Sequence, residues 1–131
     1  MKIKTLSFII VCAILICSCG VNKKINQSSS PYMTEENVTV RTESVRSVDG
    51  TEIMYGFYVI IGSFRSIENA RQYNVDLVRK GFTPVILENE EGLFRISVGG
   101  FDVENAARAR VTDIRANYEE YADVWLLVRR R

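Results

Sequence analysis

This chain contains an internal repeat of one short segment, which limits the folds that it can adopt. The segment reads Phe-Tyr-Val-Ile-Ile-Gly-Ser-Phe at residues 57–64 and returns as Phe-Arg-Ile-Ser-Val-Gly-Gly-Phe at residues 94–101. Glu-Asn-Ala follows each copy, at residues 68–70 and 104–106. β-branched and aromatic residues favour a strand, and a glycine turn followed by a polar cap favours a helix. The repeat therefore predicts two copies of a strand–helix unit in one small domain with pseudo-twofold symmetry.

The segments between and after the two copies complete the pattern. Apolar residues at helical spacing predict helices over residues 67–80 and 103–118. Strand-forming residues fill positions 82–87 and 122–128. The resulting order is β-α-β-β-α-β, which predicts an α+β fold of the ferredoxin-like type. Such a fold has a four-stranded antiparallel sheet with both helices on one face.

Alternation along the strands divides their side chains between the two faces of this sheet. We expect one face to lie under the helices and the other to be open to solvent, where it would be the only broad surface left for a ligand. The open face would carry the side chains of Tyr58, Ile60, Val85, Leu87, Arg95, Ser97, Trp125 and Leu127.

The N-terminal part of the chain has the pattern of an export signal. Two early lysines precede an apolar run over residues 6–16, and the run ends in Ile-Cys-Ser-Cys. This order resembles a bacterial lipobox, which implies that residues 1–18 are a lipoprotein signal peptide and that Cys19 is lipidated. An ordinary signal peptide with incidental cysteines and an uncleaved anchor are the alternatives. Gly20 stands where an inner-membrane retention signal often has Asp, so by resemblance to known sorting rules the outer membrane is favoured.

Two further segments separate this signal from the predicted domain. Residues 19–37 are polar and indicate a flexible tether, which would reach ~50–60 Å when extended. Residues 38–55 leave two interpretations open. Their first five residues alternate and are β-branched, which favours a lead-in strand, but the later spacing is irregular, as in a loosely ordered arm.

Composition excludes several classes of function. The formal net charge is +1 and no basic stripe occurs, which argues against a nucleic-acid partner. The chain has no histidine, and its three cysteines all lie within the first 20 residues, so we predict no metal and no cofactor. Glycosidases use pairs of carboxylates, and the candidate glutamates here fall in a loop and at a helix end, at positions 88, 90, 91, 119 and 120. Acidic loops are usually only solvated, so we predict no catalytic residue and no enzymatic activity.

The two repeat copies and their Glu-Asn-Ala triplets resemble the SPOR domain, the sporulation-related repeat. The resemblance begins at residue 56, and we expect this domain to fill residues 56–131. It implies the ferredoxin-like fold and binding of peptidoglycan, with a preference for glycan strands that lack stem peptides. It also implies that the ligand lies on the exposed face of the sheet. One position departs from the family, which often has Gln where this chain has Ile60.

Sugar chemistry and the resemblance together select the candidate contacts on that face. A tryptophan ring suits the C–H face of a sugar, and an arginine fork suits hydroxyl or carboxylate groups. The predicted glycan-binding residues are Tyr58, Ile60, Ser63, Arg95, Ser97 and Trp125. Two alternatives stay open: Trp125 could pack under the 38–48 segment, and Arg95 could form a surface salt bridge with Asp123.

These observations predict a cell-envelope lipoprotein that faces the periplasm, is held by its lipid anchor and binds peptidoglycan without cleaving it. The alternative is an envelope protein–protein interaction module. Such a module would use the apolar open face, either for a protein partner or for self-association. RNA-binding domains share the topology, but their Lys/Arg-Gly-aromatic motif is absent from the sequence.

Overall fold

The computed structural model describes residues 37–131, which belong to one compact unit. The predicted signal peptide over residues 1–18, the lipidation site Cys19 and the tether up to residue 36 lie outside the described residues.

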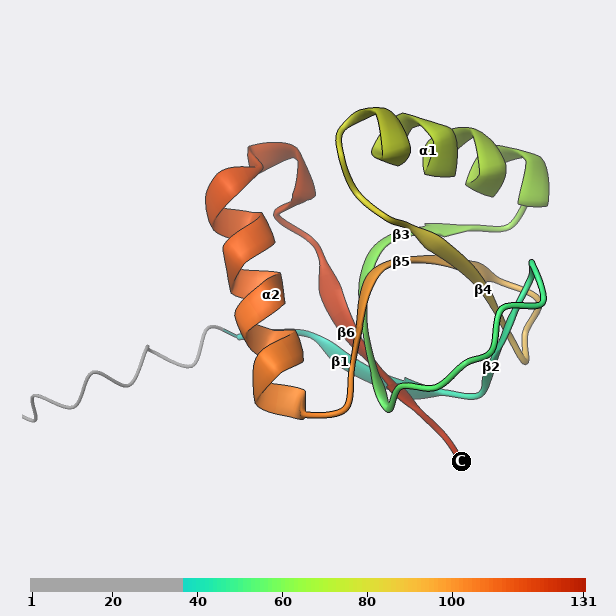
Figure 1. The fold of residues 1–131 in the computed structure, drawn as a ribbon, viewed down its shortest axis with the longest axis horizontal. Coiled ribbons are helices and arrows are strands. Elements are labelled where there is room, and N and C mark those ends of the chain that lie inside the picture. The colour runs from blue at the N-terminus through green and yellow to red at the C-terminus, as the bar shows by residue number, and fades with distance from the viewer. Residues whose placement is uncertain (1–36) are drawn as a thin grey trace, which may run out of the picture. The chain divides into compact units, whose positions relative to one another are not determined.

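The described chain contains two helices and a six-stranded sheet (Figure 1). In chain order the elements are β1 (Val40–Glu43), β2 (Val45–Ser47), β3 (Phe57–Phe64), α1 (Ile67–Arg79), β4 (Val85–Asn89), β5 (Phe94–Phe101), α2 (Glu104–Asn117), the 3-10 helix η1 (Glu119–Tyr121) and β6 (Trp125–Arg129). From β3 onward this is the predicted β-α-β-β-α-β order, so the α+β class is confirmed.

The prediction of a four-stranded antiparallel sheet is wrong. The strand order is β1-β6-β3-β5-β4-β2, in which β1 pairs with β6 in parallel and every other neighbouring pair is antiparallel. The four central strands are the expected ones. The two extra strands come from the 38–55 segment, whose β-branched residues pair with strand edges that would otherwise stay open.

The internal repeat appears in the structure as the central strand pair. β3 and β5 run antiparallel, with Phe57 opposite Phe101 and Phe64 opposite Phe94, so the first residue of each copy meets the last residue of the other. This is the pairing that a pseudo-twofold axis between the copies requires. Gly62 lies inside β3 rather than in a turn, and a Cβ there would come within 2.8 Å of the Tyr73 ring. The glycine therefore makes room for an aromatic ring of α1.

Both helices pack on the same face of the sheet, α1 against β3, β4 and β5, and α2 against β3, β5 and β6. Ser66 caps α1, because its Oγ accepts a hydrogen bond from the backbone N–H of Asn69. The helices bury Ala70, Leu77, Ala107, Val111 and Ile114 against the sheet. This helix-side core holds Val59, Ile61, Ile96 and Leu126 from the strands, as the alternation predicts.

The other face of the sheet is covered by the chain itself. Only Ser44 separates β1 from β2, yet these strands lie at opposite ends of the strand order. The sheet must curl until its two edges almost meet, and the β1–β2 segment runs from the β6 edge to the β4 edge (Figure 1). We call residues 37–56, which include β1 and β2, the arm.

Beneath the arm lies a second hydrophobic core. Its buried members are Tyr58, Ile60, Leu87 and Leu127, and the partly buried side chains packed on them are Val45, Ile53, Val85 and Trp125. The expectation of an open, solvent-facing sheet face is therefore wrong. Burial of apolar surface stabilises a fold by roughly 25 cal/mol for each Å² removed from water. An apolar second face of the sheet is therefore more stable when a segment of the chain covers it.

Candidate functional site

The structure buries four of the six predicted glycan contacts. Tyr58 is 5% exposed, Ile60 0%, Arg95 6% and Ser97 2%. The Oγ of Ser97 donates to the backbone carbonyl of Gly99 at 3.1 Å, a local bond within its own strand. These residues do not form an open sugar-binding face, because the arm lies over them. Of the six, only Ser63 is exposed and Trp125 is partly exposed.

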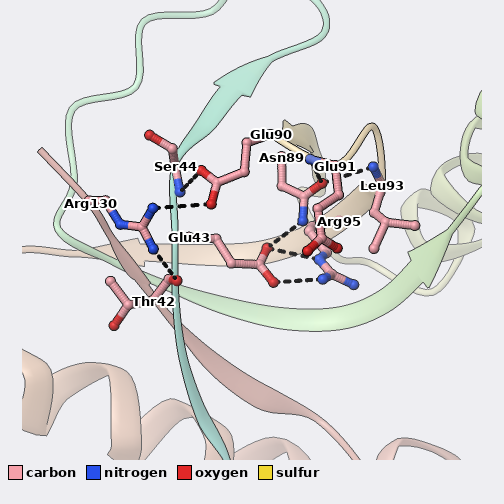
Figure 2. A network of polar contacts seen from close by, with 9 residues as sticks. All are labelled: Thr42, Glu43, Ser44, Asn89, Glu90, Glu91, Leu93, Arg95 and Arg130. Carbon is pink, nitrogen blue, oxygen red and sulfur yellow. Dashed lines mark hydrogen bonds and ion pairs between the residues drawn. The ribbon is translucent and has the colours of Figure 1, made fainter.

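Arg95 is held by a carboxylate that the arm supplies (Figure 2). Its Nε donates to one carboxylate oxygen of Glu43 at 3.0 Å, and its Nη2 donates to the other at 2.6 Å. The Nδ2 of Asn89 donates to the same carboxylate at 3.2 Å. Both ion-pair side chains are about nine-tenths buried. The partner of Arg95 is thus Glu43 in a buried pair, so the alternative of a surface salt bridge with Asp123 is not what the structure shows.

The Glu43 site also connects the arm to the hairpin between β4 and β5. Asn89, which donates to Glu43, accepts hydrogen bonds through its Oδ1 from the backbone N–H groups of Glu91 and Leu93, at 3.0 and 2.9 Å. Next to it, Glu90 accepts from the backbone N–H of Ser44 and pairs with Arg130 (Figure 2). A carboxylate and an amide thus fix the crossing point of the arm over the curled sheet.

Two guanidinium groups lie against the ring of Trp125. The guanidinium carbon of Arg95 is 5.3 Å from the ring centroid, and that of Arg41 is 5.6 Å from it. Both distances are within the range of cation–π attraction. Arg95 comes from β5 and Arg41 from the arm. The arm therefore contributes to the surroundings of the one tryptophan in the chain.

These side chains form a surface pocket of about 330 Å³, which we call the Trp125 pocket. It is lined by Thr39, Arg41, Ser63, Arg95, Asp123 and Trp125. Backbone pairing assembles it: Ser63 lies opposite Arg95 in the β3–β5 register, and Thr39 accepts a backbone hydrogen bond from Leu126 at 2.9 Å. Three of the predicted contacts thus meet in one pocket that reaches solvent, namely Ser63, Arg95 and Trp125.

Three pocket residues were missed as site residues by the sequence reasoning. Alternation places Thr39, just before β1, on the same side of the chain as Arg41 within β1, which is the only local signal they carry. Their partner strand β6 lies more than 80 residues further along the chain, and nothing local identifies it. Asp123 was considered only as a partner for Arg95. Its place beside Trp125 follows from the start of β6 at that ring.

A smaller cavity of about 120 Å³ lies between the arm and the sheet. Tyr58 and Ser97 contribute to its lining, together with Ile53 and Tyr55 of the arm. Burial raises the pKa of Tyr58, whose hydroxyl accepts a hydrogen bond from the backbone N–H of Tyr55 at 3.2 Å. The volume is well below the roughly 300 Å³ at which ordinary ligand pockets begin, so this cavity does not accommodate a sugar unit.

The chemistry of the Trp125 pocket is that of binding. It offers an apolar ring, guanidinium and hydroxyl donors, and a carboxylate acceptor, which together match the faces and edges of a sugar. Among residues 37–131, no group of three or more His, Cys, Asp or Glu side chains could hold a metal ion. Within the same residues, no helix combines the length and apolar character needed to cross a membrane.

A comparison with known protein families identifies the family to which this chain belongs. The family model of the SPOR domain matches residues 54–122, more than half of the chain. The protein therefore belongs to the SPOR domain family, whose members are peptidoglycan-binding rather than catalytic modules. Searches among curated proteins and among solved structures gave no match.

The match leaves out parts of the chain that build the Trp125 pocket. It runs from the end of the arm to just after η1, so β1, β2 and β6 fall outside it. Ser63 and Arg95 lie within the matched residues, whereas Thr39, Arg41, Asp123 and Trp125 do not. The pocket thus combines residues of β3 and β5, which lie within the match, with residues of the arm and of the chain around the start of β6, which lie outside it.

Proposed function

We propose that this protein binds peptidoglycan glycan strands that lack stem peptides, without cleaving them, and that the contact is made at the Trp125 pocket. Membership in a peptidoglycan-binding family supplies the ligand class. The observation that carries the choice of site is the meeting of Ser63, Arg95 and Trp125 in one solvent-accessible pocket. The rest of the sheet face is occupied by the arm.

The pocket has the size and composition that a sugar unit needs. Its volume of about 330 Å³ falls within the usual range of ligand pockets. The ring of Trp125 would lie against the C–H face of one sugar, while Ser63 and Asp123 would exchange hydrogen bonds with its hydroxyl or acetamido groups. The covered face with Ile60 would serve as structural support and would not touch the ligand.

We further propose that the protein is lipidated at Cys19 and faces the periplasm from the outer membrane. The lipobox pattern at residues 16–19 supports the anchor, and Gly20 after the cysteine supports the outer membrane. A polar tether over residues 19–37 would let the domain reach the cell wall from the membrane surface.

Co-sedimentation with purified sacculi tests this function. The full-length protein in mild detergent is mixed with amidase-treated and untreated sacculi, and the bound fraction is measured. We expect stronger binding to the amidase-treated material, and a change in Trp125 fluorescence when glycan is added. Trp125→Ala should bind about tenfold more weakly, whereas Val78→Ala, on the exposed part of α1, should bind as wild type does. Failure of the wild type to sediment with either preparation would overturn the proposal.

The second candidate function, a protein–protein interaction module, requires an apolar sheet face that is open to a partner. In the structure this face forms the second core beneath the arm. Large apolar side chains that remain exposed between residues 37 and 131 are spread over the arm, α1 and the N-cap residue of α2. The glycan-binding proposal is therefore the one that the pocket favours.

A further inference from the structure

We propose that Arg41 of the arm recognises the carboxylate that a muramic acid unit gains when its stem peptide is removed. This inference rests on the proposed function and deepens it, because it names the chemical group by which a peptide-free strand would be distinguished from a substituted one. It also assigns a binding role to a residue outside the matched family segment, residues 54–122.

The charges around the Trp125 pocket single out Arg41. The charge of Arg95 is neutralised by Glu43 in a buried, two-point ion pair. Arg41 is exposed, and within residues 37–131 no carboxylate lies within ion-pair distance of it. Its guanidinium lies over the face of Trp125. The pocket therefore presents a guanidinium whose hydrogen-bonding edge is available to a ligand.

Asp123 is the other charged group in the pocket, and no cation of the described residues pairs with it. A simple anion would be repelled by Asp123, so the pocket is poorly suited to phosphate or sulfate. A ligand that carries a carboxylate and also donor groups suits both charges. Such a ligand would place its carboxylate at Arg41 and a hydroxyl or amide N–H at Asp123.

A peptide-free muramic acid unit has this combination of groups. In substituted strands the lactyl carboxyl is bonded to the first stem amino acid as an amide. Hydrolysis of that amide adds water across the C–N bond, which leaves a lactyl carboxylate on the sugar and a free amine on the departing peptide. The product carries one negative charge beside sugar hydroxyls, an acetamido N–H and an apolar ring face. Arg41, Asp123 and Trp125 provide a partner for each.

The inference predicts how binding depends on the carboxylate and on salt. Wild-type protein should bind amidase-treated sacculi about tenfold more tightly than the same material whose carboxylates have been converted to primary amides with a carbodiimide and ammonia. Added salt should weaken binding to the amidase-treated sacculi that keep their carboxylates more than binding to the chemically amidated sacculi. The reason is that the Arg41 contact is solvent-exposed, so salt screens it.

Three variants of the full-length protein complete the test. Arg41→Gln should bind both preparations equally, at the level the wild type shows for the amidated one. Arg41→Lys should retain part of the preference, because it keeps the charge and loses the fork. Arg71→Gln, an exposed charge on α1 outside the pocket, should behave as wild type. Thermal melting of each variant checks that the fold is intact.

The outcomes separate this inference from the function on which it rests. A wild type that binds both preparations equally, or an Arg41→Gln variant that keeps the full preference, would overturn the carboxylate role and leave glycan binding standing. A wild type that binds neither preparation would overturn the proposed function itself, and the inference with it. Loss of the preference in Arg41→Gln alone would support both.

Discussion

Replacement of Glu43 by Ala should strongly destabilise the domain, because this one carboxylate joins the arm to the curled sheet. The substitution removes the acceptor of two hydrogen bonds from Arg95 and of one from Asn89. It leaves the Arg95 guanidinium without its carboxylate partner in a site where the side chain is only 7% exposed. Breaking a buried pair in this way costs about 3–5 kcal/mol. Small domains have only ~5–15 kcal/mol of stability, so the loss would be a large share of the total.

A matched control lies in the same network. Glu90 carries the same charge, pairs with Arg130 and accepts a backbone hydrogen bond from Ser44, but its side chain is 46% exposed. Exposed ion pairs contribute about 0–1 kcal/mol, so Glu90→Ala should cost about 1 kcal/mol. A double variant with Glu43→Met and Arg95→Met should cost less than Glu43→Ala, because neither buried charge then lacks a partner.

Urea unfolding checks these values, followed by circular dichroism and by the fluorescence of Trp125. The tryptophan lies against Arg95, so its emission reports the part of the molecule that the arm closes. Equal free-energy losses in Glu43→Ala and Glu90→Ala would refute the reasoning, since they would mean that the buried pair does not hold the arm. A double variant Glu43→Met and Arg95→Met that loses as much as Glu43→Ala, or more, would refute it as well.

Three further predictions concern Ile60 and Tyr58 in the second core and Cys19 in the sequence. Ile60→Gln should lower the free energy of unfolding by about 1–3 kcal/mol, because it places an amide in the second core; an unchanged urea midpoint would contradict that burial. Burial raises the pKa of Tyr58 above its usual 10.0, so the folded state holds the phenol proton more tightly than the unfolded chain. The corresponding stability should be present below pH 10 and lost as pH rises through the folded pKa, and Tyr58→Phe should show a smaller alkaline loss in pH-dependent unfolding. Metabolic labelling with an acyl-chain probe should mark the wild type and not Cys19→Ser, and equal labelling would exclude lipidation at that cysteine.

The repeat made the central part of the fold predictable. Its two copies became β3 and β5, and the helical spacing after each gave α1 and α2 within a few residues of their observed bounds. These signals are local: β-branched and aromatic residues for strands, Ser66 as a cap and an apolar stripe for α1. Local signals were sufficient here because each repeat unit contains a strand and the helix that packs on it.

The arm was not predictable in the same way, because its strands are short and their partners are distant. β1 has four residues and β2 has three. Register between a strand and a distant partner is set by tertiary packing, which local sequence does not specify. Glu43 lies 52 residues before Arg95, so composition and spacing gave no reason to pair them rather than to pair Arg95 with the nearer Asp123.

One signal for a covered face was nevertheless present. Residues 58–61 read Tyr-Val-Ile-Ile, which is apolar on both faces of the strand rather than alternating. Continuous apolar runs are typical of strands buried on both sides, whereas a strand with one solvated face alternates. Ile60, read as a departure at a ligand-binding position, is better explained as a core residue beneath the arm.

This explanation of Ile60 bears on how the chain divides its sheet. The arm covers the apolar middle of the face, with Ile60 and Leu127 beneath it, and leaves the first residue of β6, Trp125, accessible in the pocket. The same segment that closes the face contributes Thr39 and Arg41 to the pocket beside it.

Glu43 lies two residues after Arg41 in β1 and holds that strand in place through its ion pair with Arg95. The ion pair that stabilises the fold therefore also fixes the position from which Arg41 faces a ligand. Loss of Glu43 should weaken glycan binding even under conditions where the domain stays folded.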